Sequence, residues 1–354
     1  LPNKLAQGLE QTIIDEVHRL VPISYQTAKN PPVANGESSQ LEVSRTDGIP
    51  PKSPQQALQE FQTHADLQVQ LVASEPQITD PVAIDFGPDG SVWVVQMSDY
   101  GHGIEEEFVP SGEVRVLKDL DGDGFYESST VFMDGLRYPT DVKVWKDGAL
   151  ICDAPNIIFA RDQDADGCAE TSAVLFSGFE THNGQARVNS LRWGLDNWLY
   201  GSGGLFGGSI SNQQGAVVDV SGRDFRIQPD LGLIEPVTGR SQQGRVRDDY
   251  GNWFGCDNSS LIRHYPVVDH YLQRNPFVPP PLSSLNVPAG ENAGKLFPPS
   301  DLVLFRLSGA PGRATAACGI EIYRDRYLGP NYNNNSFTCE PVNQLVYRQV
   351  LERQ

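Results

Sequence analysis

The first 60 residues carry a different hydrophobic pattern from the rest of the chain. Apolar residues recur there at helical spacing, at Leu5, Leu9, Ile13, Val17 and Leu20. Residues 24–54 are polar and rich in Pro, Gly and Ser, which is typical of a linker or an extended arm. Ser53 followed by Pro54 predicts one short capped helix. We therefore expect residues 1–60 to form an N-terminal helix and an extended arm.

From residue 67 onward, short apolar runs of β type alternate with turns. Examples are Val92–Gln96, Val142–Val144 and Leu199–Tyr200. Runs spaced by roughly 8–12 residues, with turn signals between them, are typical of a β-sandwich, barrel or propeller. The pattern therefore predicts an all-β domain over residues 61–354.

An internal repeat favours the propeller among these folds. An apolar strand, a turn with Asp and Gly or Asn, and a second apolar strand recur around Gly90, Gly148, Asn197 and Gly251. Steps of about 50–60 residues match one four-stranded propeller blade with its loops. Gly or Asn suits these turns because hairpin turns need positive φ angles.

The repeats also predict an incomplete ring. Blades are expected to begin near residues 80, 140, 188 and 243, and a fifth at Gly319–Tyr323, shortly before the chain ends. A propeller closes into a ring, which removes its exposed sheet edges. We therefore expect about four and a half blades here, out of six or seven in a complete β-propeller. The domain is then truncated at its C-terminal side, as part of a longer protein or completed by another chain.

Two segments place acidic residues at positions 1, 3, 5 and 9 and Gly at position 6. The first contains Asp119, Asp121, Asp123 and Glu127, and the second contains Asp162, Asp164, Asp166 and Glu170. Ca²⁺ takes about 6–8 oxygen ligands, which alternate side chains of a tight turn can supply. Phe125 and Cys168, at position 7, would add backbone carbonyls, whereas the Glu at position 12 of an EF-hand is missing. We predict two structural Ca²⁺ sites; the alternative is two acidic, solvated turns.

Composition narrows the classes of partner. The formal net charge of −18 argues against a nucleic-acid partner, because phosphate backbones need a basic surface. No apolar run reaches about 18 residues, so no transmembrane segment is predicted. Because free calcium is plentiful outside the cytoplasm, the acidic loops favour an extracellular or periplasmic protein whose signal peptide has been removed.

The five cysteines form no Cys-x-x-Cys motif, so neither a zinc ribbon nor a covalently bound haem is expected. Cys318 and Cys339 flank one strand–turn–strand unit, and Cys152 and Cys168 flank another. Each is a candidate disulfide pair, and Cys256 would then be left over.

Four stretches of the sequence resemble one bacterial family: Asp80–Ile84, Arg187–Asp196, Gly251–Asn258 and Phe337–Asn343. Over residues 54–350 the chain resembles the propeller of membrane-bound dehydrogenases of planctomycete-type bacteria, which are related to quinoprotein glucose and sorbosone dehydrogenases. The resemblance implies pyrroloquinoline quinone (PQQ) on the propeller axis and a sugar, polyol, aldehyde or alcohol as substrate.

The same resemblance implies site residues. Arg240 and Gln243 match the run that holds the quinone, although the two residues between them depart from it. The general base in such dehydrogenases is a His that takes a hydroxyl proton. His182 is the nearest His, four residues before the matching position, which holds Ala here. Arg187 and Asn189 belong to the same region and would bind polar groups of the cofactor or substrate.

Two hypotheses about function stay open. The first is a quinone-dependent dehydrogenase outside the cytoplasm, which rests on Arg240, Gln243 and His182. The second is a non-catalytic propeller that serves as a binding or structural subunit of an extracellular assembly, with protein partners held by the N-terminal arm or by missing blades. The displaced His and the altered arginine motif favour the second hypothesis.

Overall fold

The computed structural model describes residues 52–98, 100, 110–275, 277, 283–288, 290–297 and 312–352. The expected helix over residues 5–20 and the arm up to residue 51 lie outside these residues. The short capped helix is confirmed as α2 (Pro54–Leu58). The Ser53 side chain accepts a hydrogen bond from the Gln56 amide, and the Gln56 side chain accepts one from the Ser53 amide. This reciprocal capping satisfies two N–H groups that the first helical turn leaves unpaired.

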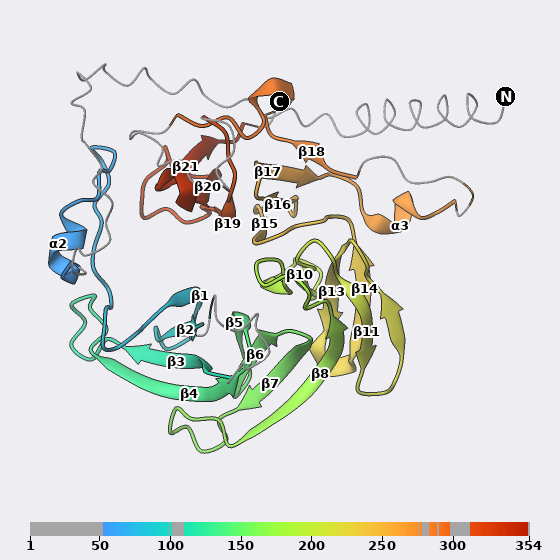
Figure 1. Ribbon diagram of the computed structural model, residues 1–354, viewed down its shortest axis with the longest axis horizontal. Helices are drawn as coiled ribbons and strands as arrows, with labels where there is room; N and C mark the ends of the chain where they lie inside the picture. Colours follow the sequence, from blue (N-terminus) through green and yellow to red (C-terminus); the bar gives the residue numbers. More distant parts are fainter. Residues whose placement is uncertain are drawn as a thin grey trace.

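The described strands form five sheets, or blades, that follow one another around a central axis (Figure 1). Blade 1 contains β1 (Pro81–Phe86), β2 (Val92–Gln96), β3 (Gly112–Lys118) and β4 (Ser128–Leu136). Blade 2 contains β5 (Pro139–Trp145), β6 (Gly148–Asp153), β7 (Asn156–Arg161) and β8 (Thr171–Phe179). Blade 3 contains β9 (Asn189–Trp193), β10 (Leu199–Ser202), β13 (Asp224–Gln228) and β14 (Leu233–Val237).

Blade 4 contains β15 (Arg245–Arg247), β16 (Trp253–Asp257), β17 (Ser260–Tyr265) and β18 (Leu285–Asn286). Blade 5 contains β19 (Cys318–Ile322), β20 (Asn335–Glu340) and β21 (Leu345–Val350). The few described helical segments besides α2 are α3 (Asp269–Leu272) and the 3₁₀ turns Pro229–Leu231, Gly290–Asn292 and Pro341–Asn343.

The all-β propeller class is therefore confirmed, but the predicted number of blades is wrong. The region after residue 317 forms a fifth sheet of three strands, rather than half a blade of a six- or seven-bladed ring. The repeated turns locate strand pairs, whereas the number of blades depends on the angle at which neighbouring blades pack. That angle is set by side chains on facing sheets, and the turn pattern does not encode it.

The repeated turns do connect the first and second strands of their blades. Gly90, Asn197 and Gly251 adopt positive φ angles of 85°, 62° and 83° in the turns of blades 1, 3 and 4. In blade 2 the left-handed residue is Lys146, with a φ angle of 53°, rather than the expected Gly148. An Asp stabilises these turns through backbone amides, as when Asp89 accepts a hydrogen bond from the amide two residues later.

The hydrophobic core lies between neighbouring blades. One cluster joins blades 2 and 3 and includes Leu150, Cys152, Phe176 and Phe225, all fully buried. A second cluster joins blades 1 and 2, and a third joins blades 4 and 5. Inner strands that pack in this way bury apolar side chains on both sheet faces, which is the main stabilising contribution of a propeller.

A hairpin inserted within blade 3 leaves that blade and extends blade 2. β11 (Gly208–Asn212) pairs with β8 and with β12 (Val217–Asp219), so the blade 2 sheet has six strands (Figure 1). A Cβ atom at Gly178 would lie 2.2 Å from the Ser209 carbonyl oxygen, and one at Gly208 would lie 2.3 Å from the Gly178 carbonyl oxygen. Two glycines with positive φ angles therefore allow the close approach that ties blade 3 to blade 2.

The segment before β1, residues 62–77, connects blade 5 to blade 1, and we call it the strap. The Tyr332 hydroxyl of blade 5 donates a hydrogen bond of 2.6 Å to Asp66. Farther along, the carbonyl of Val72 accepts a 2.8 Å hydrogen bond from the Tyr126 amide, and that of Gln77 accepts one of 2.7 Å from the Ser129 hydroxyl. The strap thus contacts the first blade and the last one.

Candidate metal turns and axial cavity

The two predicted acidic segments form equivalent turns, between the third and fourth strands of blade 1 and of blade 2. We call them turn 1 (residues 119–127) and turn 2 (residues 162–170). In each turn, one oxygen from each of the four carboxylates lies within 4.8 Å of the others. Carboxylate oxygens gathered at this separation are the donor set that a hard cation such as Ca²⁺ prefers. Both clusters can therefore hold a metal ion.

The Asp at position 1 organises each turn through backbone amides. In turn 1, Asp119 accepts hydrogen bonds of 2.7 Å from the Gly122 amide and 2.9 Å from the Gly124 amide. Hydrogen bonding from the Gly124 amide lowers the pKa of Asp119 below its ordinary value. The equivalent bonds of turn 2, to Asp162, measure 2.6 and 2.9 Å. The same local sequence therefore produces the same folded turn twice.

The other predicted ligands repeat as well. Glu127, at position 9, accepts a hydrogen bond from the amide at position 2, and Glu170 does the same in turn 2. The amides of Phe125 and Cys168, at position 7, donate 2.8 Å hydrogen bonds to the Asp at position 5 of their turns. These two carbonyls stay predicted ligands. Gly at position 6 adopts a φ angle of about 92° in both turns, a left-handed conformation that favours Gly.

Each turn concentrates negative charge. In turn 2 the Asp166 amide lowers the pKa of Asp164 by hydrogen bonding. The charges of Asp166, Glu170 and Asp162, together with partial desolvation, outweigh this effect and raise the pKa of Asp164 overall. A bound divalent cation would relieve this repulsion between carboxylates.

The position-8 amide of each turn binds the element beside it. In turn 2 the Ala169 amide donates a 2.8 Å hydrogen bond to the carbonyl of Phe132, in the outer strand of blade 1. In turn 1 the Tyr126 amide donates an equivalent 2.8 Å bond to Val72 of the strap. The strap thus occupies, beside blade 1, the place that an outer blade strand occupies beside blade 2.

A cavity of about 240 Å³ lies near the propeller axis, because residues of blades 1, 2, 4 and 5 and the loops on either side of blade 3 line it. Its described lining is Val82, Met97, Tyr100, Thr140, Gly184, Gln185, Arg187, Gln242, Gln243, Asn258, Ala316 and Cys318. Amides and hydroxyls dominate the polar part, and Arg187 is the one charged residue in this described lining. The cavity therefore offers hydrogen-bond donors and a single positive charge.

Two of the predicted cofactor residues, Arg187 and Gln243, line this cavity. The Arg187 guanidinium lies 4.0 Å from the centre of the Tyr138 ring and donates hydrogen bonds to the carbonyls of Thr181 and Asn183. These contacts fix the position of its side chain in the cavity lining. The loop before β9 therefore positions the cation, and the loop before β15 supplies the amides.

The structure does not bring the other three predicted residues into the cavity. Asn189 is only 1% exposed, and its amide bonds to the carbonyls of Arg187 and Gln242 and to the Gly244 amide, so it joins blades 3 and 4. Arg240 is exposed and donates to the Leu205 carbonyl.

His182 is also exposed. It lies 3.2 Å from a Glu180 carboxylate oxygen, and its ring packs edge-on against Phe206. The roles assigned to it and to Arg240 stay predictions, without support from the cavity's geometry.

Sequence reasoning missed Gln185, Gln242 and Asn258 as lining residues. Gln242 was noted only as a departure from the quinone-binding run, and Asn258 closed one of the family-like stretches. Both lie at loop positions, so no periodic pattern singled them out. They meet because the loops of different blades converge on the axis.

All five cysteines are thiols in the described structure. Cys318 and Cys339 face each other as register partners on β19 and β20, so they are the candidate pair that the fold brings together. Cys152 is fully buried in the core between blades 2 and 3, whereas Cys168 lies in turn 2. Burial raises the pKa of the Cys318 thiol to about 11, so this thiol stays protonated near neutral pH.

The fold and these sites define a five-bladed β-propeller with two acidic turns. The chain belongs to the family described as Domain of unknown function (DUF7133), whose model matches residues 53–354. No curated protein matches the sequence. The finer resemblance, to quinoprotein dehydrogenases, stays a prediction. In the described part of the chain, no helix combines the length and apolar character needed to cross a membrane.

Solved structures with similar folds are distant. A catalytically inactive virginiamycin B lyase from Staphylococcus aureus is 12% identical, with a TM-score of 0.40 over 80% of this chain and 73% of that one. A luciferin-regenerating enzyme is 8% identical, with a TM-score of 0.47 over 78% and 76%. A Thermus thermophilus protein described as an oxidoreductase (glucose dehydrogenase) is 14% identical, with a TM-score of 0.30 over 77% and 96%. Likenesses this low say nothing about activity.

Proposed function

We propose that this protein is a calcium-binding propeller whose axial cavity binds a small, negatively charged polar ligand without catalysis. The observation that carries the proposal is the described lining of the axial cavity, in which amides and hydroxyls surround the single cation Arg187. Such donors suit carboxylate or similar oxygen acceptors, because charge-assisted hydrogen bonds are the stronger ones. We extend the proposal to an extracellular or periplasmic location and to protein partners bound through the N-terminal region.

The calcium part of the proposal rests on the donor set of the two turns. The four carboxylates of each turn would hold the ion, with the carbonyls of Phe125 and Cys168 completing it. A bound Ca²⁺ would supply positive charge that neutralises the carboxylates and rigidifies the turn. Calorimetric titration of the chelated protein with Ca²⁺ should give two sites per chain. If the titration detected no bound Ca²⁺, the calcium part of the proposal would be wrong.

A quinone-dependent dehydrogenase is the second candidate, and Arg187 and Gln243 in the axial cavity favour it. The described residues fit PQQ poorly. PQQ carries several carboxylates, whereas one cation lines the described cavity, and the predicted base His182 is exposed outside it. We therefore derive no reaction step for this group.

One experiment separates the two candidates. Succinate and PQQ are titrated separately into the calcium-loaded protein, into the Arg187→Gln variant and into the Arg240→Gln variant. The two arginines form a matched pair, because both bond to loop carbonyls but only Arg187 lines the cavity. Succinate binding that is lost in Arg187→Gln and kept in Arg240→Gln supports the binding module. PQQ binding that requires Arg240, followed by sugar-dependent dye reduction, would establish the dehydrogenase instead.

A further inference from the structure

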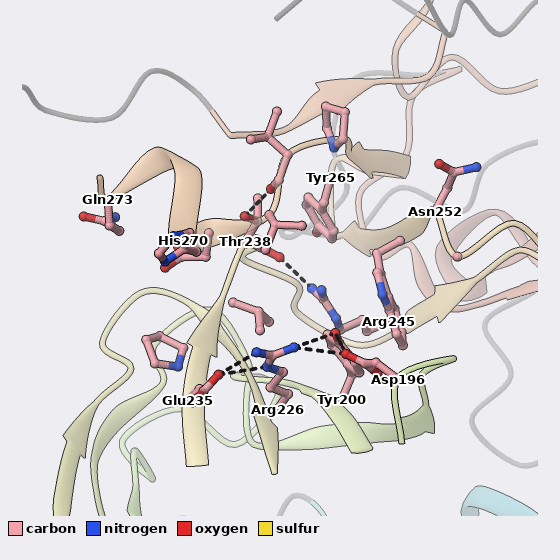
Figure 2. A pocket seen from close by; sticks show the side chains of 18 of the residues that line it. Asp196, Tyr200, Arg226, Glu235, Thr238, Arg245, Asn252, Tyr265, His270 and Gln273 are labelled. Atoms are coloured by element: carbon pink, nitrogen blue, oxygen red, sulfur yellow. Dashed lines mark hydrogen bonds and ion pairs between the residues drawn. The ribbon is translucent and has the colours of Figure 1, made fainter. Parts of the chain in front are cut away.

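A second and larger cavity opens between blades 3 and 4, away from the axis. Figure 2 shows the side chains that line it. Its volume is about 800 Å³, within the range of ligand-binding pockets. We call it the wedge pocket. Its lining includes Asp196, Tyr200, Glu235, Asn252, Trp253 and His270. Nothing in the axial proposal uses these residues.

The wedge pocket exists because blade 4 is incomplete on its outer side. Its outermost strand, β18, has two residues, and α3 follows β17 in the place where a longer strand would continue. An ion pair between Asp269 of α3 and Arg223 fixes the helix to blade 3. The Thr238 hydroxyl donates a hydrogen bond to the Val267 carbonyl, which joins the blades again at the back of the pocket. Both walls are therefore held in place.

The floor of the pocket is formed by side chains in close contact with one another. The Tyr200 and Trp253 rings stack with their centres 4.1 Å apart. The Arg245 side chain, 2% exposed, lies 4.9 Å from the Trp253 ring and pairs with the buried carboxylate of Asp224. Its Nε atom is buried and has no hydrogen-bond partner within the described part of the chain. A buried donor of this kind is costly unless a ligand or water accepts from it.

The two sides of the pocket offer different hydrogen-bonding groups, as Figure 2 shows. On blade 3, Glu235 accepts hydrogen bonds from Arg226 through Oε2, which leaves Oε1 without a hydrogen bond among the described residues. Across the pocket, His270 and Gln273 extend from α3, and neither side chain makes a hydrogen bond within the described structure. The blade 3 side therefore offers a hydrogen-bond acceptor, and the α3 side offers donors as well as acceptors.

The formal charges of the lining cancel. Asp196, Glu235 and Asp269 balance Arg226, Arg245 and Arg274. The Glu235 carboxylate would repel a phosphate, and the Arg274 guanidinium would repel a cationic ligand. A hydroxyl group both donates and accepts hydrogen bonds, so it suits both sides. Leu195, 66% exposed, and Val268, 59% exposed, add apolar surface at the rim.

From these observations we propose that the wedge pocket is a binding site for a neutral carbohydrate of about two or three sugar units. Ring hydroxyls bond to Glu235 on one side and to Gln273 and His270 on the other. The apolar faces of the sugar rings lie against Leu195 and Val268. The site is independent of the axial cavity, since the two linings share no residue.

The test is calorimetric titration of the calcium-loaded protein with maltotriose, cellotriose and chitotriose. Trigalacturonate and inorganic phosphate serve as charged probes. At least one neutral trisaccharide should bind with a Kd between about 10 μM and 10 mM. Gln273→Ala and His270→Ala should each weaken that binding by about fivefold, which corresponds to one neutral hydrogen bond. Gln55→Ala is the matched control, because Gln55 is also an exposed glutamine at a short helix.

Exposed residues were chosen so that the variants keep the wild-type melting temperature. The proposal is overturned if no neutral trisaccharide reaches saturation. It is also overturned if a charged probe binds more tightly than every neutral sugar. Sugar binding that both α3 variants leave unchanged would place the site elsewhere and would overturn the assignment of this pocket.

Discussion

Turn 1 and turn 2 make the same internal hydrogen bonds but hold different neighbours. In turn 2, the amide of Ala169 bonds to Phe132, a buried residue of β4 in blade 1. In turn 1, the amide of Tyr126 bonds to Val72 of the strap, which belongs to no described sheet. The comparison shows that one local design serves two purposes, joining blade to blade in one place and fastening the strap in the other.

Removal of calcium should have the largest effect, because it acts on both turns. At free calcium about 100 times Kd, each site adds about 2.7 kcal/mol to the free energy of unfolding. Chelation with EGTA should therefore lower the melting temperature by roughly 10 °C. Differential scanning calorimetry measures the shift, and re-addition of calcium should reverse it. An unchanged melting temperature would favour acidic, solvated turns.

Single-site variants should separate the two turns. Asp162→Ala and Asp119→Ala each remove the residue that organises one turn, so calcium stoichiometry should fall from two to one in both. About half of the chelation shift should remain in each variant. Hydrogen exchange should rise in β4 for Asp162→Ala and in the strap for Asp119→Ala. If hydrogen exchange rose in the same region in both variants, the conclusion that the two turns hold different neighbours would be contradicted.

An exchange of residues at position 4 should have a smaller effect, of opposite sign in the two turns. Turn 1 has Gly122 there, with a φ angle of 80°, and turn 2 has Ala165, with a φ angle of 64°. Left-handed φ angles cost a residue with a Cβ atom about 1 kcal/mol. Ala165→Gly should therefore raise the free energy of unfolding by about 1 kcal/mol, and Gly122→Ala should lower it by a similar amount. Urea unfolding measures both changes. If the two variants changed the free energy of unfolding in the same direction, the result would be inconsistent with the shared geometry.

The smallest effect is expected at the far end of the strap. Tyr332→Phe removes the hydrogen bond to Asp66 and should increase proteolytic cleavage in the strap without changing calcium stoichiometry. That bond, and then His64, lower the pKa of Asp66 below the ordinary 3.8. The ionised carboxylate therefore stabilises the folded state above pH 3.8, and this contribution disappears as the pH falls through the lower, folded-state pKa. Cleavage that is equal in both proteins at neutral pH would show that the bond does not hold the strap.

Local sequence predicted the elements whose geometry is local. The acidic spacing of turn 1 and turn 2 predicted their geometry, because each Asp at position 1 bonds to amides only a few residues away. The capped helix α2 and the glycine turn at Gly90 follow from the same kind of short-range chemistry. Among the quinone-site residues, Arg187 and Gln243 reached the axial cavity, whereas His182 did not.

By itself, then, the sequence determined the all-β class, the repeated blade turns and both acidic turns. The class follows from short apolar runs that repeat along the chain, and the turns follow from hydrogen bonds that close within about ten residues. Only the tertiary structure decided the number of blades, the lining of the axial cavity and the wedge pocket. Those features depend on how the facing sheets pack and on short elements such as β18 and α3. Packing of this kind joins residues from separate blades, and no spacing along the chain records it.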